Sequence, residues 1–152
     1  MKKLILPLLL ILLLLPSCGS GETAAQTQFG DFVLTLTTAR TAYDTNTVDL
    51  SAPFEITATL VYKGETELTT DYAEPIFNFY IFAPGEEIEP LDRPAIVEQP
   101  ITCTPGQVFT FFTDGAFCVN SDGVLPAGTY TAYVNVVIDG RSAELSLPFD
   151  VK

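Results

Sequence analysis

Apart from its carboxylates, this 152-residue sequence offers few side chains suited to acid–base or metal chemistry. It contains no His, which is the commonest general base at neutral pH and the commonest metal ligand in proteins. Ser–His–Asp and Cys–His catalysis are therefore excluded. The 19 acidic residues permit a two-carboxylate hydrolase by composition alone, but no glycine-rich phosphate-binding loop is present. We expect a protein without enzymatic activity, cofactor or metal centre.

The first of three cysteines, Cys18, follows a segment typical of an export signal. Two lysines precede an apolar run over residues 4–15, which is too short to span a membrane and has the length of a secretory h-region. The tetrapeptide Leu15-Pro16-Ser17-Cys18 resembles the lipobox of bacterial lipoproteins. The resemblance implies a signal peptide over residues 1–17, cleavage before Cys18 and acylation of the Cys18 thiol. The alternative is an ordinary secreted protein that is cleaved elsewhere.

Lipidation at Cys18 would anchor the chain in a bacterial cell envelope. More than one acyl chain makes such an anchor stable. Gly19 follows the cysteine, where lipoproteins held at an inner membrane often carry Asp, so an outer membrane is favoured if the organism has one. We expect a flexible tether over residues 18–28 and one folded domain over residues 29–152. The expected partners are this membrane, through the lipid anchor, and an envelope protein whose identity is unknown.

The remaining cysteines, Cys103 and Cys118, form an even pair in an oxidising compartment. A disulfide between them would close a loop of about fifteen residues and contribute about 3 kcal/mol in chain-entropy estimates. A reactive thiol would need a base, and zinc would need further ligands, but the chain has no His. The sequence therefore predicts a structural disulfide between Cys103 and Cys118.

Acidic residues dominate the charge of the chain. The net charge is −12 and the isoelectric point is near 4.1, which excludes nucleic acid as a partner because phosphates require clustered Lys and Arg. Two acidic clusters supply oxygens of the kind that calcium prefers. Neither has the spacing of a calcium loop, so solvated acidic turns are the simpler reading. The clusters are Glu86, Glu87, Glu89 and Asp92, and Asp114, Asn120 and Asp122.

A proline-rich segment from Pro84 to Pro105 is the candidate binding loop. Its five prolines stiffen the chain and remove donors needed for sheet pairing. A stiff loop loses less entropy when it binds a partner. The alternative is an ordinary solvated connection between two sheets. The candidate partner-binding side chains are Leu91, Arg93, Ile96 and Val97.

Most of the chain beyond residue 28 alternates apolar and polar residues with the period of a β-strand. No segment of eleven or more residues keeps a helical period. Asp139-Gly140 fits a type I′ hairpin turn, and Pro148 places the last strand at an edge or a bulge. Alternating runs lie over residues 32–37, 54–63, 77–81, 130–138 and 142–151, and the last two are the clearest.

Short strands separated by turn signals predict an all-β protein with a single antiparallel, immunoglobulin-like β-sandwich of about seven strands, preceded by the signal peptide. The segment from Leu125 to Tyr130 is similar to the entry of the penultimate strand in immunoglobulin-like domains. We expect Tyr130 to form a tyrosine corner, with its hydroxyl bonded to nearby backbone. The alternative is a core aromatic residue without that bond.

Three patterns occur in order: Phe77 to Glu86, Thr104-Pro105-Gly106-Gln107, and Leu125 to Tyr130. Together they resemble the BsuPI-like intracellular proteinase inhibitor domains, which are small β-sandwiches. The resemblance implies no particular inhibitory residues. If the domain did inhibit a protease, the proline-rich loop would be the candidate segment by its position and stiffness, with Arg93, which precedes Pro94, as the candidate specificity residue. The sequence as a whole favours a non-catalytic protein-binding or accessory module of the cell envelope. A BsuPI-like protease inhibitor and a calcium-binding surface domain are the alternatives.

Overall fold

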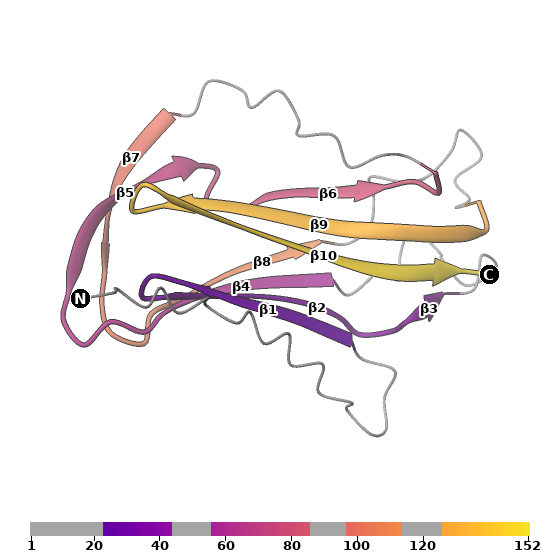
Figure 1. The fold of residues 1–152 in the computed structure, drawn as a ribbon, viewed down its shortest axis with the longest axis horizontal. Coiled ribbons are helices and arrows are strands. Elements are labelled where there is room, and N and C mark those ends of the chain that lie inside the picture. The colour runs from indigo at the N-terminus through magenta and orange to yellow at the C-terminus, as the bar shows by residue number, and fades with distance from the viewer. Residues whose placement is uncertain (1–22, 44–55, 86–96, 114–125) are drawn as a thin grey trace, which may run out of the picture.

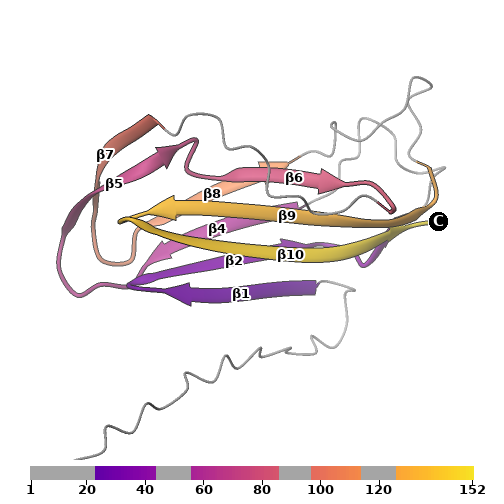
Figure 2. The same ribbon diagram turned by 45° about the horizontal axis from the view of Figure 1, so that its top comes forward.

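The computed structural model describes residues 23–43, 56–85, 97–113 and 126–152, and these residues form an all-β fold of two sheets. Sheet A has four antiparallel strands in the order β1-β2-β4-β8. Its strands are β1 (Thr23–Phe29), β2 (Phe32–Thr38), β4 (Ile56–Tyr62) and β8 (Val108–Thr113). The strands lie side by side in Figure 2.

Sheet B has six strands in the order β3-β10-β9-β5-β7, and β6 also pairs with β9. β5 and β7 lie across the left end of the molecule in Figure 1. β10 pairs with β9 along its whole length. On its other side it pairs with β3 only at Asp150 and Val151, so Pro148 lies where β10 is an edge strand. The sequence predicted an edge or a bulge at this residue. The strands are β3 (Ala42–Tyr43), β5 (Leu68–Glu74), β6 (Asn78–Phe82), β7 (Val97–Cys103), β9 (Gly128–Ile138) and β10 (Arg141–Val151).

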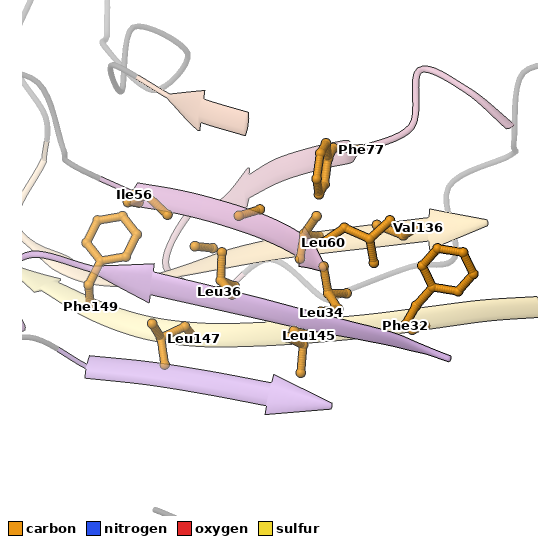
Figure 3. Packing of buried hydrophobic residues seen from close by; sticks show 14 of the residues in the cluster. Phe32, Leu34, Leu36, Ile56, Leu60, Phe77, Val136, Leu145, Leu147 and Phe149 are labelled. Carbon is orange, nitrogen blue, oxygen red and sulfur yellow. The ribbon is translucent and has the colours of Figure 1, made fainter. Parts of the chain in front are cut away.

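The hydrophobic core fills the space between the sheets. β2 and β4 each bury every second side chain, which is the pattern expected of a strand with one face on a core and one on solvent. Figure 3 shows these side chains pointing toward those of β9 and β10. Members of the core from both sheets are Phe32, Leu34, Leu36, Ile56, Leu60, Val136, Leu145, Leu147 and Phe149.

Glycine-containing turns fix the register of two hairpins. Asp139 and Gly140 have φ values of 56° and 64°, so both central residues of the β9–β10 turn have the positive φ that a type I′ turn requires. The sequence predicted this turn. At the β1–β2 turn, Gly30 has a φ of 56°, where a residue with a Cβ would be strained.

Three details of the predicted fold need correction. The described residues contain ten strands rather than about seven, because β1, β3, β5 and β7 lack the clear apolar alternation of the others. Sheet B is mixed, since β3 pairs with β10 in parallel. Residues 23–28, which we expected in the flexible tether, belong to β1, because the partly buried Ala25 and Phe29 pack on the core.

Within the described ranges, no helix has the length and hydropathy needed to span a membrane.

Candidate binding surface

The outer face of sheet A is a regular array of uncharged side chains. β1, β2, β4 and β8 each contribute three residues, because alternate side chains point away from the core and the strands are paired in register. We use the name "outer face of sheet A" for these residues: Ala24, Gln26, Gln28, Val33, Thr35, Thr37, Thr57, Thr59, Val61, Val108, Thr110 and Phe112.

Backbone pairing places these side chains in three rows across the sheet. Thr35, Thr59 and Thr110 occupy neighbouring strands in the central row, beside Gln26 at the β1 edge. The Gln26 side-chain amide donates a hydrogen bond of 3.2 Å to the Thr35 hydroxyl. The Thr37 hydroxyl donates to the Thr57 carbonyl oxygen at 3.4 Å. The centre of the face is therefore polar but uncharged.

Two exposed apolar residues lie on the β8 side of this face. Val108 is 56% exposed and Phe112 is 53% exposed, and Val97 is the other large apolar residue exposed to this degree in the described part of the chain. Burial of an exposed phenyl ring and its neighbours against a partner is favourable in proportion to the apolar area removed from water. Burial of Val108 and Phe112 would therefore favour the binding of a partner at this side of the face.

The outer face of sheet B differs in charge. It carries exposed Glu98 on β7 and exposed Glu144 on β10, and the partly exposed Asp150 also lies on β10. The Asn135 side-chain amide donates to a Glu144 carboxylate oxygen at 3.2 Å. These carboxylates make their parts of the face less suited to the centre of a protein interface, because charged groups are depleted there.

An aromatic cluster on sheet B packs against itself. Tyr80 and Phe82 of β6 lie beside Tyr133 of β9 on the outer face, with ring centroids 6.0 to 6.4 Å apart. All three residues are partly buried. Aromatic pairs at these separations contribute about 0.5–1.5 kcal/mol beyond the area they bury. The cluster therefore contributes to the pairing of β6 with β9.

The predicted binding loop lies mostly outside the described residues. Leu91, Arg93 and Ile96 fall in the undescribed range 86–96. Val97 is described as the first residue of β7 and is 56% exposed. Residues 97–103 of the proline-rich segment form strand β7 rather than a loop. β7 accommodates Pro100 because it is the edge strand of sheet B and pairs with β5 alone among the described strands.

Of the three cysteines, Cys103 alone lies in the described residues. Its thiol is free and fully buried, and burial raises the pKa of the Cys103 thiol. A raised pKa keeps the thiol protonated at neutral pH, which does not suit a nucleophile. No disulfide is found within the described ranges, and Cys18 and Cys118 lie outside them. The disulfide between Cys103 and Cys118 and the lipidation of Cys18 stay predictions.

Tyr130 makes the hydrogen bond that a tyrosine corner requires. Its side chain is 2% exposed, and its hydroxyl donates to the carbonyl oxygen of Pro126 at 2.9 Å. The ring stacks on Phe149, with a centroid distance of 5.7 Å. Tyr130 is thus held between the backbone at the start of β9 and the core side of β10, and its role is structural.

Both acidic clusters considered for calcium, residues 86–92 and residues 114–122, lie outside the described residues. Among the residues that are described, no group of three or more His, Cys, Asp or Glu side chains is placed to hold a metal ion.

Sequence reasoning missed the outer face of sheet A as a site. The alternating threonines at 35, 37, 57 and 59 were visible as the polar side of two strands. Their assembly into one face depends on the strand order β1-β2-β4-β8, which places residues 23–29 in the same sheet as residues 108–113. The missed signal was the absence of charge from the polar positions of four strands in a strongly acidic chain.

No protein-family model matches the chain, and no curated protein matches it either.

Proposed function

We propose that this protein is a non-catalytic, lipid-anchored module of the bacterial cell envelope that binds a protein partner through the outer face of sheet A. The observation that carries the proposal is the absence of charged residues from this face in a chain with a net charge of −12. Contact through the face brings no buried charge into the interface, whereas contact through sheet B would desolvate carboxylates.

The composition of the face fits a protein interface. Interface centres are depleted in charged residues and enriched in aromatic ones, and Phe112 supplies an exposed aromatic ring. Threonine hydroxyls add hydrogen-bonding groups that water can satisfy in the free protein. Strand spacings of about 4.8 Å and a rise of about 3.3 Å per residue give the four-stranded face an area of roughly 400 Å². That is about half of what one partner buries in a standard complex, so a single copy should bind transiently.

The proposed position of the protein in the envelope rests on the sequence alone. Cleavage before Cys18 and acylation of its thiol would anchor the chain, and the sandwich would then begin five residues later, at Thr23. A short connection would hold the domain close to the membrane. A Cys18→Ser variant should lose incorporation of labelled palmitate and be released from the membrane fraction. Unchanged labelling of this variant would rule out the anchor.

An immunoglobulin-like arrangement is part of the proposal. The Tyr130 corner and the packing of two sheets on one core support it. The predicted loop residues Leu91, Arg93, Ile96 and Val97 stay candidates for a second contact, and exposed Val97 lies on β7 of sheet B rather than on sheet A.

Photo-crosslinking in living cells tests the binding surface. A photoreactive amino acid is placed at Thr59, in the centre of the face, and at Ser146, an exposed residue on the outer face of sheet B. A third position, Val97, tests the loop. We expect Thr59 to capture a defined protein that Ser146 does not capture. Equal capture at both positions would remove the basis for the proposed surface, and capture confined to Val97 would assign binding to the Val97 end of β7 instead.

A further inference from the structure

The β8 edge of sheet A has a sequence that favours pairing with another strand. Among the described strands, β8 pairs with β4 alone, so one side of its backbone has no strand partner there. Its sequence, Val108-Phe109-Thr110-Phe111-Phe112-Thr113, has high β-propensity and contains no charge, proline or glycine. These are the features of an edge that pairs with another strand.

Two of the other edges among the described strands, β7 and β10, carry features that oppose pairing, whereas the edge strand β1 is uncharged but consists mostly of Ala, Gln and Thr, and the edge strand β6 has only five residues. β7 contains Glu98 and Pro100. β10 contains Pro148 in the part of the strand that pairs with β9 but not with β3. Proline removes an N–H donor, and a charged residue at an edge penalises the approach of another strand. β8 has neither device, although the surrounding protein is strongly acidic.

The hydrogen-bonding pattern shows which backbone groups of β8 face outward. The Tyr62 N–H donates to the Gln107 carbonyl oxygen at 3.0 Å, just beyond the start of β8. Hydrogen-bonded and non-hydrogen-bonded positions alternate along an antiparallel pair. The N–H and C=O groups of Phe109 and Phe111 therefore point to β4. Those of Val108, Thr110 and Phe112 point to the free edge.

This spacing is self-complementary. If two copies of β8 pair antiparallel about Thr110, Thr110 faces the Thr110 of the second copy and Val108 faces its Phe112. All outward backbone groups of Val108, Thr110 and Phe112 then find partners, which gives about six hydrogen bonds. Phe109 faces Phe111 of the second copy on the core side. Aromatic, β-branched and Thr–Thr cross-strand pairs each contribute about 0.2–1 kcal/mol.

We propose that two copies of this chain join through β8, which makes one continuous eight-stranded sheet from two copies of sheet A. Two acidic molecules can approach here because neither β8 nor the outer face beside it carries a charge. Pairing uses the backbone edge and leaves the outer faces free. It doubles the uncharged face to roughly 800 Å², the area that one partner buries in a standard complex.

This inference deepens the proposed function but rests on β8 alone. A six-residue strand pair makes a small interface, so the dimer should be weak in dilute solution and favoured where an anchor raises the local concentration. Dimerisation and partner capture are separate readouts. If Thr59 captured no partner, the proposal of a β8 dimer would be unaffected. If no dimer formed, the proposal that a partner binds the outer face of sheet A would be unaffected.

Cysteine crosslinking of the full chain in cells tests the dimer. In the proposed register the two Thr110 Cα atoms lie about 5.5 Å apart, whereas the two Thr59 positions are separated by three strand spacings, about 14 Å. Thr110→Cys and Thr59→Cys variants are treated with a bifunctional thiol reagent too short to bridge those three spacings. The unsubstituted chain shows the background from its own cysteines. We expect a covalent species of twice the chain mass from Thr110→Cys alone.

A backbone variant separates edge pairing from accidental proximity. Val108→Pro removes an N–H on the free edge at the first residue of the strand, where proline is tolerated, and Val108→Thr keeps that N–H. In the Thr110→Cys chain, Val108→Pro should reduce the crosslinked dimer several-fold and Val108→Thr should not. Dimer yield at Thr110→Cys no greater than at Thr59→Cys would overturn the proposal. So would a crosslink from Thr110→Cys to a different protein, which would make that protein the occupant of the edge.

Discussion

Tyr130 shows how much one residue type in one local pattern can predict. A Tyr shortly after a Pro-containing turn indicated a hydroxyl bonded to nearby backbone, and the structure places that hydroxyl 2.9 Å from the Pro126 carbonyl oxygen. The prediction needed no long-range information, because the donor and the acceptor are four positions apart. Cys103 is the contrasting case, because its predicted pairing depends on a residue that lies outside the described part of the chain.

A Tyr130→Phe variant should lower the free energy of unfolding by about 1 kcal/mol, because it removes the hydrogen bond of a nearly fully buried hydroxyl and keeps the ring. Denaturant unfolding of the purified protein measures the change. Tyr80→Phe, at a partly buried tyrosine on the outer face of sheet B, is the matched control and should change stability less. Equal effects of the two substitutions would show that the corner bond contributes nothing specific.

Tyr62 links stability to alkaline pH. Its hydroxyl donates to the Thr66 carbonyl oxygen at 2.8 Å. Desolvation by burial, followed by the charges of Asp31, Cys103 and Asp139, raises the pKa of Tyr62 above its ordinary value near 10. As pH rises, the unfolded chain therefore loses this proton before the folded chain does, and the free energy of unfolding falls.

The Tyr62 contribution should be fully present below about pH 10 and should be lost as the pH rises through the folded pKa. Comparison of the wild type with Tyr62→Phe isolates it from other groups. Unfolding free energies are measured from roughly pH 8 to pH 11, the range around the tyrosine pKa. Over this range the wild type should lose more stability than the variant. Parallel curves for the two proteins would contradict this assignment.

At the scale of elements, strands with a full apolar face were predictable and weak edge strands were not. β2, β4, β9 and β10 bury apolar side chains, most of them large, at alternate positions, so their period is plain in the sequence. β1 has the same period in its burial but uses small and polar residues, and its composition indicated a tether. Its partner strand β2 supplies the pairing that a single-sequence pattern does not show.

Two adjacent alanines test whether β1 belongs to the folded domain. Ala25 is partly buried against the core, and Ala24 is exposed on the outer face of sheet A. Ala25→Asp should lower the free energy of unfolding by about 2 kcal/mol, because it places a carboxylate against apolar side chains. Ala24→Asp should have a much smaller effect. If residues 23–28 were a tether, the two variants would unfold at the same denaturant concentration.

At the scale of the whole molecule, the distribution of charge over the two outer faces could not be predicted from the sequence. Composition correctly indicated an acidic chain, but the separation of charge between the two outer faces arises from strand order and register. Thr35, Thr59 and Thr110 become neighbours only in the folded sheet. The account of function therefore depends on one property of the fold: a face without charge on a molecule that is otherwise strongly acidic.

A charge placed on that face tests this central claim most directly. Thr35 lies opposite Thr59 on the neighbouring strand, so Thr35→Glu adds a carboxylate beside a photoreactive residue at position 59. Ser146→Glu adds the same charge to sheet B as the control. The account predicts that Thr35→Glu abolishes capture of the partner from position 59 and that Ser146→Glu preserves it, with both variants folded as the wild type. Undiminished capture in the Thr35→Glu protein would contradict the account, because the partner would then not require an uncharged face.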